Sequence, residues 1–338
     1  MRREPLIRAL LRSEHPSIRW RVRTGALGED PGSLALRRLQ GQIRKSPVAR
    51  ALLARRDRKG EIHVRYNPYD KWQGAHWVLA SLAEIGYPPG DETLAPLRDQ
   101  VFAFWLRDTY YREFCADTRQ KAYRGSGVPL MQGRYRRCAS QQGNALFSAA
   151  RLGLDDAPGS ERLVERLLHW QWPDGGWNCD KNPGADTSSF METILPLRAL
   201  ALYGQRSGNR DARAAAKRAG EVFLSRKLYR RRSDGREIAR TFTELHHPLY
   251  WHYDVLGGLE GMAELGALGD PRCADALDLL EASELPGGGW PATETFSRAS
   301  KKLENGSDYV HWGGTSRTKP NEWVSARALA VLRAAGRG

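Results

Sequence analysis

The sequence lacks any long run of hydrophobic residues. Its longest apolar stretches, Trp77 to Ala83 and Ala199 to Tyr203, are much shorter than the roughly 20 residues that a membrane-spanning helix needs. Residues 1–17 are basic but contain neither an apolar core nor a small-residue cleavage site, so they do not resemble an export signal. We therefore expect a cytoplasmic protein without a transmembrane segment.

Cysteine is also scarce. The chain has four cysteines, which are far apart and form no Cys-x-x-Cys pair: Cys115, Cys138, Cys179 and Cys273. This spacing argues against a zinc ribbon or a disulfide framework. Runs of β-branched residues are few as well, whereas helical periodicity dominates the chain. The sequence therefore predicts an all-α fold.

Charge, in contrast, is abundant and mostly basic. The net charge of the chain is +14, and basic runs lie at Arg134 to Arg137 and at Lys227 to Arg232. Solvated helix faces, an anionic small substrate such as a diphosphate, or nucleic acid would each explain such a charge. No recognised nucleic-acid motif accompanies it, so we favour solvated faces first and an anionic small molecule second, and we do not expect a nucleic-acid partner. The sequence does not indicate an oligomeric state.

Five apolar, alanine-rich segments end in glycine and recur at intervals of about 50 to 70 residues: 77–86, 144–153, 195–204, 259–266 and 328–336. More charged helical segments alternate with them, which is typical of an inner and an outer ring of helices. With the N-terminal helices within residues 1–60 closing the ring, we count roughly six inner and six outer helices. The prediction is a single domain over residues 1–338, an α/α toroid in the form of an α6–α6 barrel of helical hairpins.

Three finer expectations accompany this architecture. One helix should run from Ser33 to about Arg56. Another should begin near Ser188 and stop at Gly204. Residues 108–131 should form a long loop, and because loops of that length are usually functional or mobile, it is a candidate lid.

The chain is organised around the turn QWPDGGWNCD, from Gln171 to Asp180. Gln171 and Asp174 can bond backbone groups at helix ends, Gly175 and Gly176 permit positive φ, and Trp177 is a large plug between helices. The design returns in weaker form at residues 285–292 and, without its tryptophan, at residues 54–62.

QWPDGGW resembles the QW-type repeat turn of the terpenoid cyclase and prenyltransferase-like superfamily, which includes squalene-hopene cyclases and the β subunits of protein prenyltransferases. The resemblance covers most of the chain as architecture. More particularly, the chain is similar to bacterial single-domain members that carry this repeat. It implies an α6–α6 barrel with a central cavity, in agreement with the helix count.

The catalytic motifs of that superfamily carry over poorly. The DxDD acid of squalene-hopene cyclases has no counterpart, since Asp155 and Asp156 lie in a turn between predicted helices. Against the Asp-x-Cys pair that holds zinc in protein prenyltransferases, Asp186 matches the aspartate, but Ser188 replaces the cysteine. The position of the later histidine falls on Trp251, one residue before His252.

In such a ring, the loops that enter the inner helices converge on one mouth. Titratable and aromatic residues gather at these helix starts. The candidate catalytic residues are Asp180, Asp186, Glu192, His252 and Asp254. The candidate substrate-binding residues are Tyr69, Trp72, His76, Arg134, Arg137, Gln142, Trp251, Trp312, Lys319 and Trp323. The candidate ligands for a divalent metal such as zinc are Cys179, Asp186 and His252.

Each candidate has a structural alternative. Asp186, with Ser188, could cap a helix instead. His252 and Asp254 diverge by about 200° on a helix, so both cannot point at the ring axis. The aromatic residues could pack in the core.

The sequence as a whole predicts an enzyme that acts on a small, largely apolar substrate, isoprenoid or diphosphate-bearing, in the central cavity. The reaction would be a cyclisation or a group transfer assisted by Asp, Glu and His acid–base chemistry or by a metal. A carbohydrate-active lyase or hydrolase and a non-catalytic binding scaffold remain alternatives.

Overall fold

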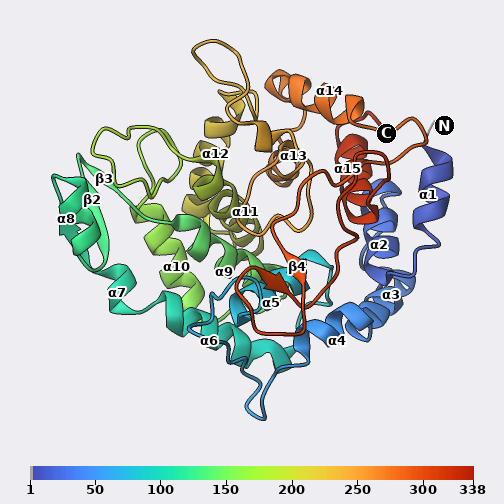
Figure 1. Cartoon of the computed structure of the whole chain (residues 1–338), viewed down its shortest axis with the longest axis horizontal. Coiled ribbons are helices and arrows are strands. Elements are labelled where there is room, and N and C mark those ends of the chain that lie inside the picture. The colour runs from blue at the N-terminus through green and yellow to red at the C-terminus, as the bar shows by residue number, and fades with distance from the viewer. Residues whose placement is uncertain (1–2) are drawn as a thin grey trace.

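The computed structural model describes residues 3–338, and the predicted all-α class is confirmed: helices make up the body of the molecule and strands are few and short (Figure 1). Within these residues, no helix combines the length and the apolar character needed to cross a membrane.

Six inner helices contact one another in a closed order. They are α2 (Pro16–Arg21), α5 (Ala75–Glu84), α9 (Ala139–Arg151), α11 (Phe190–Ser207), α13 (Val255–Glu264) and α15 (Glu322–Ala334). From α5 to α15 each packs on the next, and α15 packs on α2 and on its π-helical extension η1 (Val22–Ala26). The guanidinium of Arg21 returns to α5, where it bonds the carbonyl of Glu84 at 2.6 Å and its carboxylate at 3.0 Å. This closed order is what the predicted toroid requires of its inner helices.

The remaining longer helices lie outside this set. They are α1 (Glu4–Leu10), α3 (Leu34–Arg44), α4 (Pro47–Leu53), α6 (Ala95–Trp105), α10 (Pro158–His169), α12 (Arg210–Leu224) and α14 (Ala274–Ala282). From α6 onward, each outer helix packs on the inner helix that precedes it in the chain. Short 3-10 turns η2 (Glu92–Leu94), η3 (Arg240–Phe242) and η4 (Pro271–Cys273) complete the connections.

The predicted loop at 108–131 is instead a structured excursion. It contains α7 (Asp108–Tyr111), β1 (Glu113–Cys115), α8 (Arg119–Arg124) and β2 (Val128–Met131). β2 pairs in parallel with β1 and antiparallel with β3 (Arg134–Tyr135), so the backbone groups of the segment are bonded to one another. These elements form one flank of the molecule (Figure 1). A second small pair, β4 (Arg298–Ala299) and β5 (Ser307–Asp308), lies near the C-terminus.

Two predicted helix boundaries are wrong. The helix expected from Ser33 to Arg56 is broken, because Ser46 caps a new helix that begins at Pro47. The helix expected to stop at Gly204 continues to Ser207 and ends at Gly208, whose φ is +76°. Gly204 serves packing instead, since a Cβ there would lie 2.7 Å from the Arg213 side chain on α12.

The glycine-tryptophan turns are structural joints between helices. The Trp177 indole N–H donates to the carbonyl of Leu167 at 3.0 Å, and the Trp290 indole N–H donates to the carbonyl of Leu280 at 2.7 Å. Both carbonyls lie near the C-terminal ends of outer helices, where the N–H group four residues later does not bond them. Both tryptophans are fully buried. The turns therefore fix one outer helix to the next inner helix and do not present their tryptophans to a ligand.

The space between the inner helices is narrow where the central cavity was expected. Among the described residues, a cavity of about 40 Å³ lies between α5, α9, α11 and the segment 248–250. That volume suits about one water molecule. The ring is closed by the loop before α13, because Tyr250 stacks on Trp72 at a centroid distance of 3.9 Å. Buried Asp308 accepts hydrogen bonds from the Tyr250 hydroxyl and the Trp312 indole and holds this plug in place.

Candidate functional site at the mouth of the helix ring

Two thiols and a carboxylate meet at the N-terminal ends of α9 and α11. One ligating atom from each of Cys138, Cys179 and Glu192 lies within 4.8 Å of the others. The Sγ atom of Cys179 is 3.3 Å from Oε1 of Glu192 and donates to it. All three residues are half-buried. We call this set the thiol–carboxylate cluster.

Local structure explains how the cluster forms. Cys138 occupies the N-cap position of α9, and Glu192 lies in the first turn of α11. Cys179 follows the tryptophan turn, which the Trp177 hydrogen bonds fix to α10 and α11. The backbone N–H of Ser140 donates to Oε2 of Glu192 at 3.0 Å and thereby sets the orientation of the carboxylate.

Burial and mutual proximity disfavour negative charge in the metal-free cluster. Burial raises the pKa of the Glu192 carboxyl above its ordinary value. The pKa of the Cys179 thiol is raised strongly, first by its interaction with Cys138 and then by burial and by the charge of Glu192. The pKa of nearby Tyr69 is also raised, chiefly by burial. The cluster therefore holds protons that it can give up.

A buried arginine lies next to the cluster. The Arg137 guanidinium has its centre 5.1 Å from the ring of Tyr110, 5.7 Å from Trp170 and 5.9 Å from Trp105. Its N–H groups bond Gln142 at 3.2 Å and Gln141 at 3.4 Å. Within residues 3–338, no carboxylate lies within ion-pairing distance of it. Arginine stays protonated in proteins, so Arg137 places an unpaired positive charge beside the three acidic groups.

A belt of aromatic rings continues from the cluster across the mouth. Tyr69 packs against Trp77 at 5.0 Å, Trp77 against Trp72 at 4.6 Å, and Trp72 against His252 at 5.8 Å. His252 is in turn stacked between the rings of Trp251 and Phe296. The Lys71 ammonium lies over the rings of Trp251 (4.9 Å) and Trp72 (5.4 Å). Trp72, Trp77 and His252 are buried, so the belt is accessible only at its ends, where Tyr69, Trp251 and Phe296 are partly exposed.

The structure separates the five predicted catalytic residues. Asp180 and Asp186 are exposed in the loop before α11, where they accept hydrogen bonds from Asn182 and Thr187. Asp254 is buried and caps α13, accepting from the N–H groups of His246 and Gly257. His252 lies in the aromatic belt, where burial lowers its pKa to about 3. Glu192 alone of the five belongs to the thiol–carboxylate cluster.

Asp186 does not cap α11 either. The carboxylate of Asp174, in the tryptophan turn, accepts from the N–H and hydroxyl of Ser188 at 2.7 Å and 2.6 Å. Asp174 thereby fixes Ser188, two residues before α11 begins, and no side chain of the described residues caps the helix itself.

The predicted substrate-binding residues also divide. Tyr69 and Trp251 are partly exposed at the mouth, whereas Trp72, Arg137 and Gln142 are buried beside it. Trp312 and Trp323 are buried against the ring of His247, and Lys319 is exposed outside this contact set. His76 is buried as well; its Nδ1 accepts from the Trp105 indole at 3.1 Å, and its Nε2 lies 3.1 Å from Nδ2 of Asn144.

The basic run at 134–137 does not form one anion-binding surface. Arg136 bonds the carbonyls of Ala185 and Pro183 and lies over Trp172 at 4.6 Å. Arg134 lies near the same ring, at 5.8 Å. Alternate residues of an extended segment point to opposite sides, so Arg137 turns toward the mouth while its neighbours do not.

The predicted metal ligands are not assembled as a set. Among residues 3–338, two groups of three metal-binding side chains come together, and neither contains Asp186 or His252. Cys179 joins Cys138 and Glu192, whereas the second group is Asp57, Glu61 and His63 at a surface turn.

Four residues at the mouth are not among the predicted site residues: Cys138, Gln141, Lys71 and Phe296. Cys138 lies 41 positions before Cys179, so the sequence carries no ligand-spacing signal that joins the two cysteines. Phe296 comes from a loop that carries no motif. The one signal that could have indicated them is that the starts of the inner helices converge on the same mouth.

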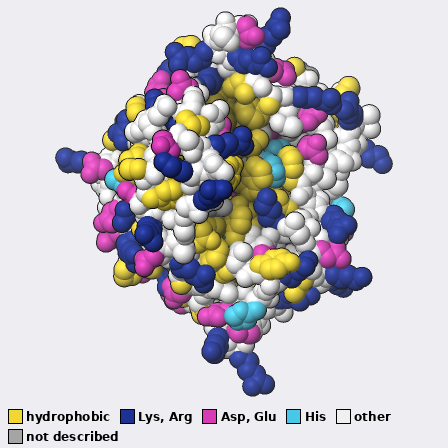
Figure 2. Space-filling model, turned by 60° about the vertical axis from the view of Figure 1, so that its left-hand side comes forward, with side chains coloured by type: hydrophobic (Ala, Val, Ile, Leu, Met, Phe, Trp, Pro, Cys, Tyr) yellow, Lys and Arg dark blue, Asp and Glu magenta, His cyan; other side chains and the backbone are white. Residues whose placement is uncertain are grey.

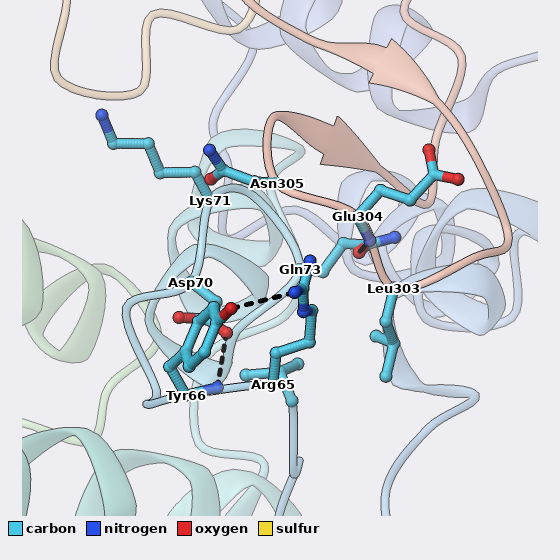
Figure 3. A pocket seen from close by; sticks show the side chains of 9 residues that line it. Arg65, Tyr66, Asp70, Lys71, Gln73, Leu303, Glu304 and Asn305 are labelled. Atoms are coloured by element: carbon cyan, nitrogen blue, oxygen red, sulfur yellow. Dashed lines mark hydrogen bonds between the residues drawn. The ribbon is translucent and has the colours of Figure 1, made fainter.

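Two surface features complete the description. A pocket of about 40 Å³ lies between residues 64–73 and 303–305, too small for more than a water molecule, and the Lys71 side chain points away from Asp70 and Arg65 there (Figure 3). On another view, a long furrow lined by hydrophobic side chains hollows the surface, with Lys and Arg side chains along it (Figure 2).

No family model matches the sequence, and no similar sequence is found among the curated proteins. Among solved structures, the chain is similar to a protein from Actinoplanes, with 17% identity and a TM-score of 0.43 over 95% of this chain and 90% of that one. It is also similar to the type II terpene cyclase MstE from Scytonema, with 14% identity and a TM-score of 0.29 over 90% of this chain and 100% of that one. That cyclase was solved in complex with geranylgeranyl dihydroxybenzoate. Likeness at this level assigns no residue and no reaction.

Proposed function

We propose that the protein is an enzyme that binds a small, largely apolar substrate at the mouth of the helix ring and acts on it with the thiol–carboxylate cluster. The observation that carries this proposal is the continuity of the aromatic belt with the cluster. Tyr69 connects the two: its ring packs on Trp77, and its pKa is raised chiefly by burial and further by the nearby groups Glu192, Cys138 and Cys179. An apolar molecule on the belt therefore reaches groups that can exchange protons or hold a metal.

The mouth replaces the central cavity as the place of reaction. The space inside the ring holds about one water molecule, whereas an isoprenoid chain of three or more units needs several hundred Å³. Lys71 and Arg137 supply positive charge beside the belt, which suits a substrate with an anionic end such as a diphosphate. The reaction would be a cyclisation or a group transfer in which Glu192 donates or accepts the proton.

The carbohydrate-active alternative loses its main support. Such an enzyme would need a second carboxylate opposite Glu192. Asp180 and Asp186, the candidates for that role, are exposed and bonded within their own loop. The binding scaffold remains the competing reading, and turnover distinguishes it from an enzyme.

Binding can be tested by titrating the untagged protein with farnesol and with farnesyl diphosphate while following tryptophan fluorescence. We expect both probes to bind, and we expect Trp251→Leu and Phe296→Ala each to weaken binding about tenfold, because each removes a large apolar contact. Leu34→Ala is the matched control, since Leu34 is an exposed hydrophobic residue at the start of α3. Absence of binding by the folded wild-type protein would refute the proposal.

Turnover can be tested with the same diphosphate by analysing the products by mass spectrometry. Glu192→Gln should abolish product formation while leaving the affinity for farnesol within about twofold of the wild type. Tight binding without any product from the wild type would favour a scaffold over an enzyme.

A further inference from the structure

We propose that Cys138, Cys179 and Glu192 bind one zinc ion, with a fourth coordination position open toward the mouth. The role of the metal in a reaction rests on the function proposed above, but the site itself does not. These residues differ from Asp186, Ser188 and Trp251, the positions that match the zinc ligands of protein prenyltransferases.

The donor set selects the metal. Two sulfur atoms and one carboxylate oxygen suit zinc, whereas magnesium and calcium prefer oxygen ligands alone. Three protein ligands with one free position are the arrangement found in catalytic zinc sites. The free position would accept water or an anionic group of the substrate.

The geometry is close to what coordination requires. In a tetrahedral zinc site with sulfur and oxygen ligands, the donor atoms are about 3.5 to 3.8 Å apart. Here the Cys179 Sγ and Glu192 Oε1 atoms are 3.3 Å apart, and all three donors lie within 4.8 Å of one another. Side-chain movements of about 1 Å would bring them into place.

The charge around the cluster fits a bound divalent ion. Two thiolates and a carboxylate carry three negative charges, so a zinc ion leaves the complex with one negative charge. Arg137 is buried beside the cluster and has no carboxylate partner within the described residues. Its single positive charge would balance the loaded site.

The surroundings also orient the ligands. The Ser140 N–H bonds Oε2 of Glu192 and leaves Oε1 directed at Cys179. Outer contacts of this kind hold metal ligands in position in known sites. The N-terminal end of α9, a helix of 13 residues, adds a favourable potential for negative sulfur at Cys138.

The second group of potential ligands serves as an internal comparison. Asp57, Glu61 and His63 lie at a surface turn, where the Asp57 carboxylate already accepts from the N–H groups of Lys59 and Glu61. No sulfur ligand is present in that group. We therefore expect it to bind zinc weakly or not at all.

The test is cobalt and zinc binding to untagged, reduced, full-length protein. We expect one equivalent of zinc after dialysis, and with Co²⁺ a sulfur-to-cobalt charge-transfer absorption in the near ultraviolet. Cys138→Ser and Cys179→Ser should each weaken binding by more than about 100-fold, beyond the effect of losing an outer contact. Cys115→Ser and His63→Ala are the controls and should bind one equivalent unchanged, because Cys115 is exposed on β1 and His63 belongs to the surface group.

Glu192→Gln keeps both sulfur ligands. It tests the site even if the cysteine variants fail to fold. It should retain the charge-transfer band but bind cobalt at least about tenfold more weakly. The proposal is overturned if the reduced wild type binds no metal, if both serine variants keep their metal, or if His63→Ala loses it. Farnesol binding is measured without metal. Absence of farnesol binding would therefore refute the proposed function but not the proposed zinc site.

Discussion

Replacing Trp177 by phenylalanine should destabilise the fold without changing the site. The change removes the indole N–H and leaves the Leu167 carbonyl of α10 without that donor in the core, which costs about 1–3 kcal/mol. The smaller ring also leaves a space worth about 1 kcal/mol at a fully buried position. The expected loss is therefore about 2–4 kcal/mol. The same change at Trp290 should cost about 1 kcal/mol less, because the Leu280 carbonyl also accepts from the N–H of Ser283 at 3.2 Å.

Thermal unfolding followed by circular dichroism measures this difference. A loss of that size in a chain of 338 residues should lower the Tm by about 3–6 °C for Trp177→Phe and by less for Trp290→Phe. Farnesol binding should be unchanged at a temperature where both variants are folded. The reasoning fails if Trp177→Phe keeps the wild-type Tm but loses farnesol, since Trp177 would then contact the ligand and not join helices.

Three further predictions concern charge. Because the pKa of Glu192 is raised, the native protein keeps a proton that the unfolded chain loses above about pH 4.5, so native stability falls as the pH rises. Glu192→Gln should therefore gain stability relative to the wild type from pH 4.5 upward. A constant Tm difference between pH 4 and 8 would contradict this. Burial lowers the pKa of His76 to about 3, so between pH 3 and 6.5 the unfolded chain binds a proton that the native protein does not, and stability decreases as the pH is lowered below 6.5. In His76→Gln, although it is less stable, the free energy of unfolding should change with pH less steeply, by about 1.4 kcal/mol per pH unit in that range. An unaltered pH dependence in denaturant melts would refute this. Lys71→Met should weaken farnesyl diphosphate several-fold but not farnesol, as an exposed charge contact of about 1 kcal/mol implies, and an equal loss for both probes would show that Lys71 does not meet the anion.

Helix identity was predictable because it depends on local patterns. Alanine-rich segments closed by glycine correspond to α5, α9, α11, α13 and α15, as the structure shows. Boundaries failed where packing outweighed a local signal. Gly204 looks like a stop in the sequence, but it lies inside α11 because α12 approaches it too closely for a side chain.

The site was predictable only in part. Glu192 and Cys179 were identified from their place at a helix start, yet their association with Cys138 depends on the way α9 and α11 pack, which no spacing in the chain records. The loop before α13 was expected to line a cavity, but its Tyr250 stacks on Trp72 from the segment before α5 and closes the ring. Asp308, which anchors that plug, comes from a polar segment without a recognisable motif.

The central claim is that an apolar molecule binds at the mouth of the helix ring, and photo-crosslinking tests it most directly. A benzophenone derivative of farnesol, irradiated with the wild-type protein and mapped by peptide mass spectrometry, should label the segments that carry the belt and the cluster: 69–72, 137–142, 179–192, 250–252 and 296. Unlabelled farnesol should suppress these adducts. Labelling that is spread over the outer helices, or that farnesol does not suppress, would contradict the account.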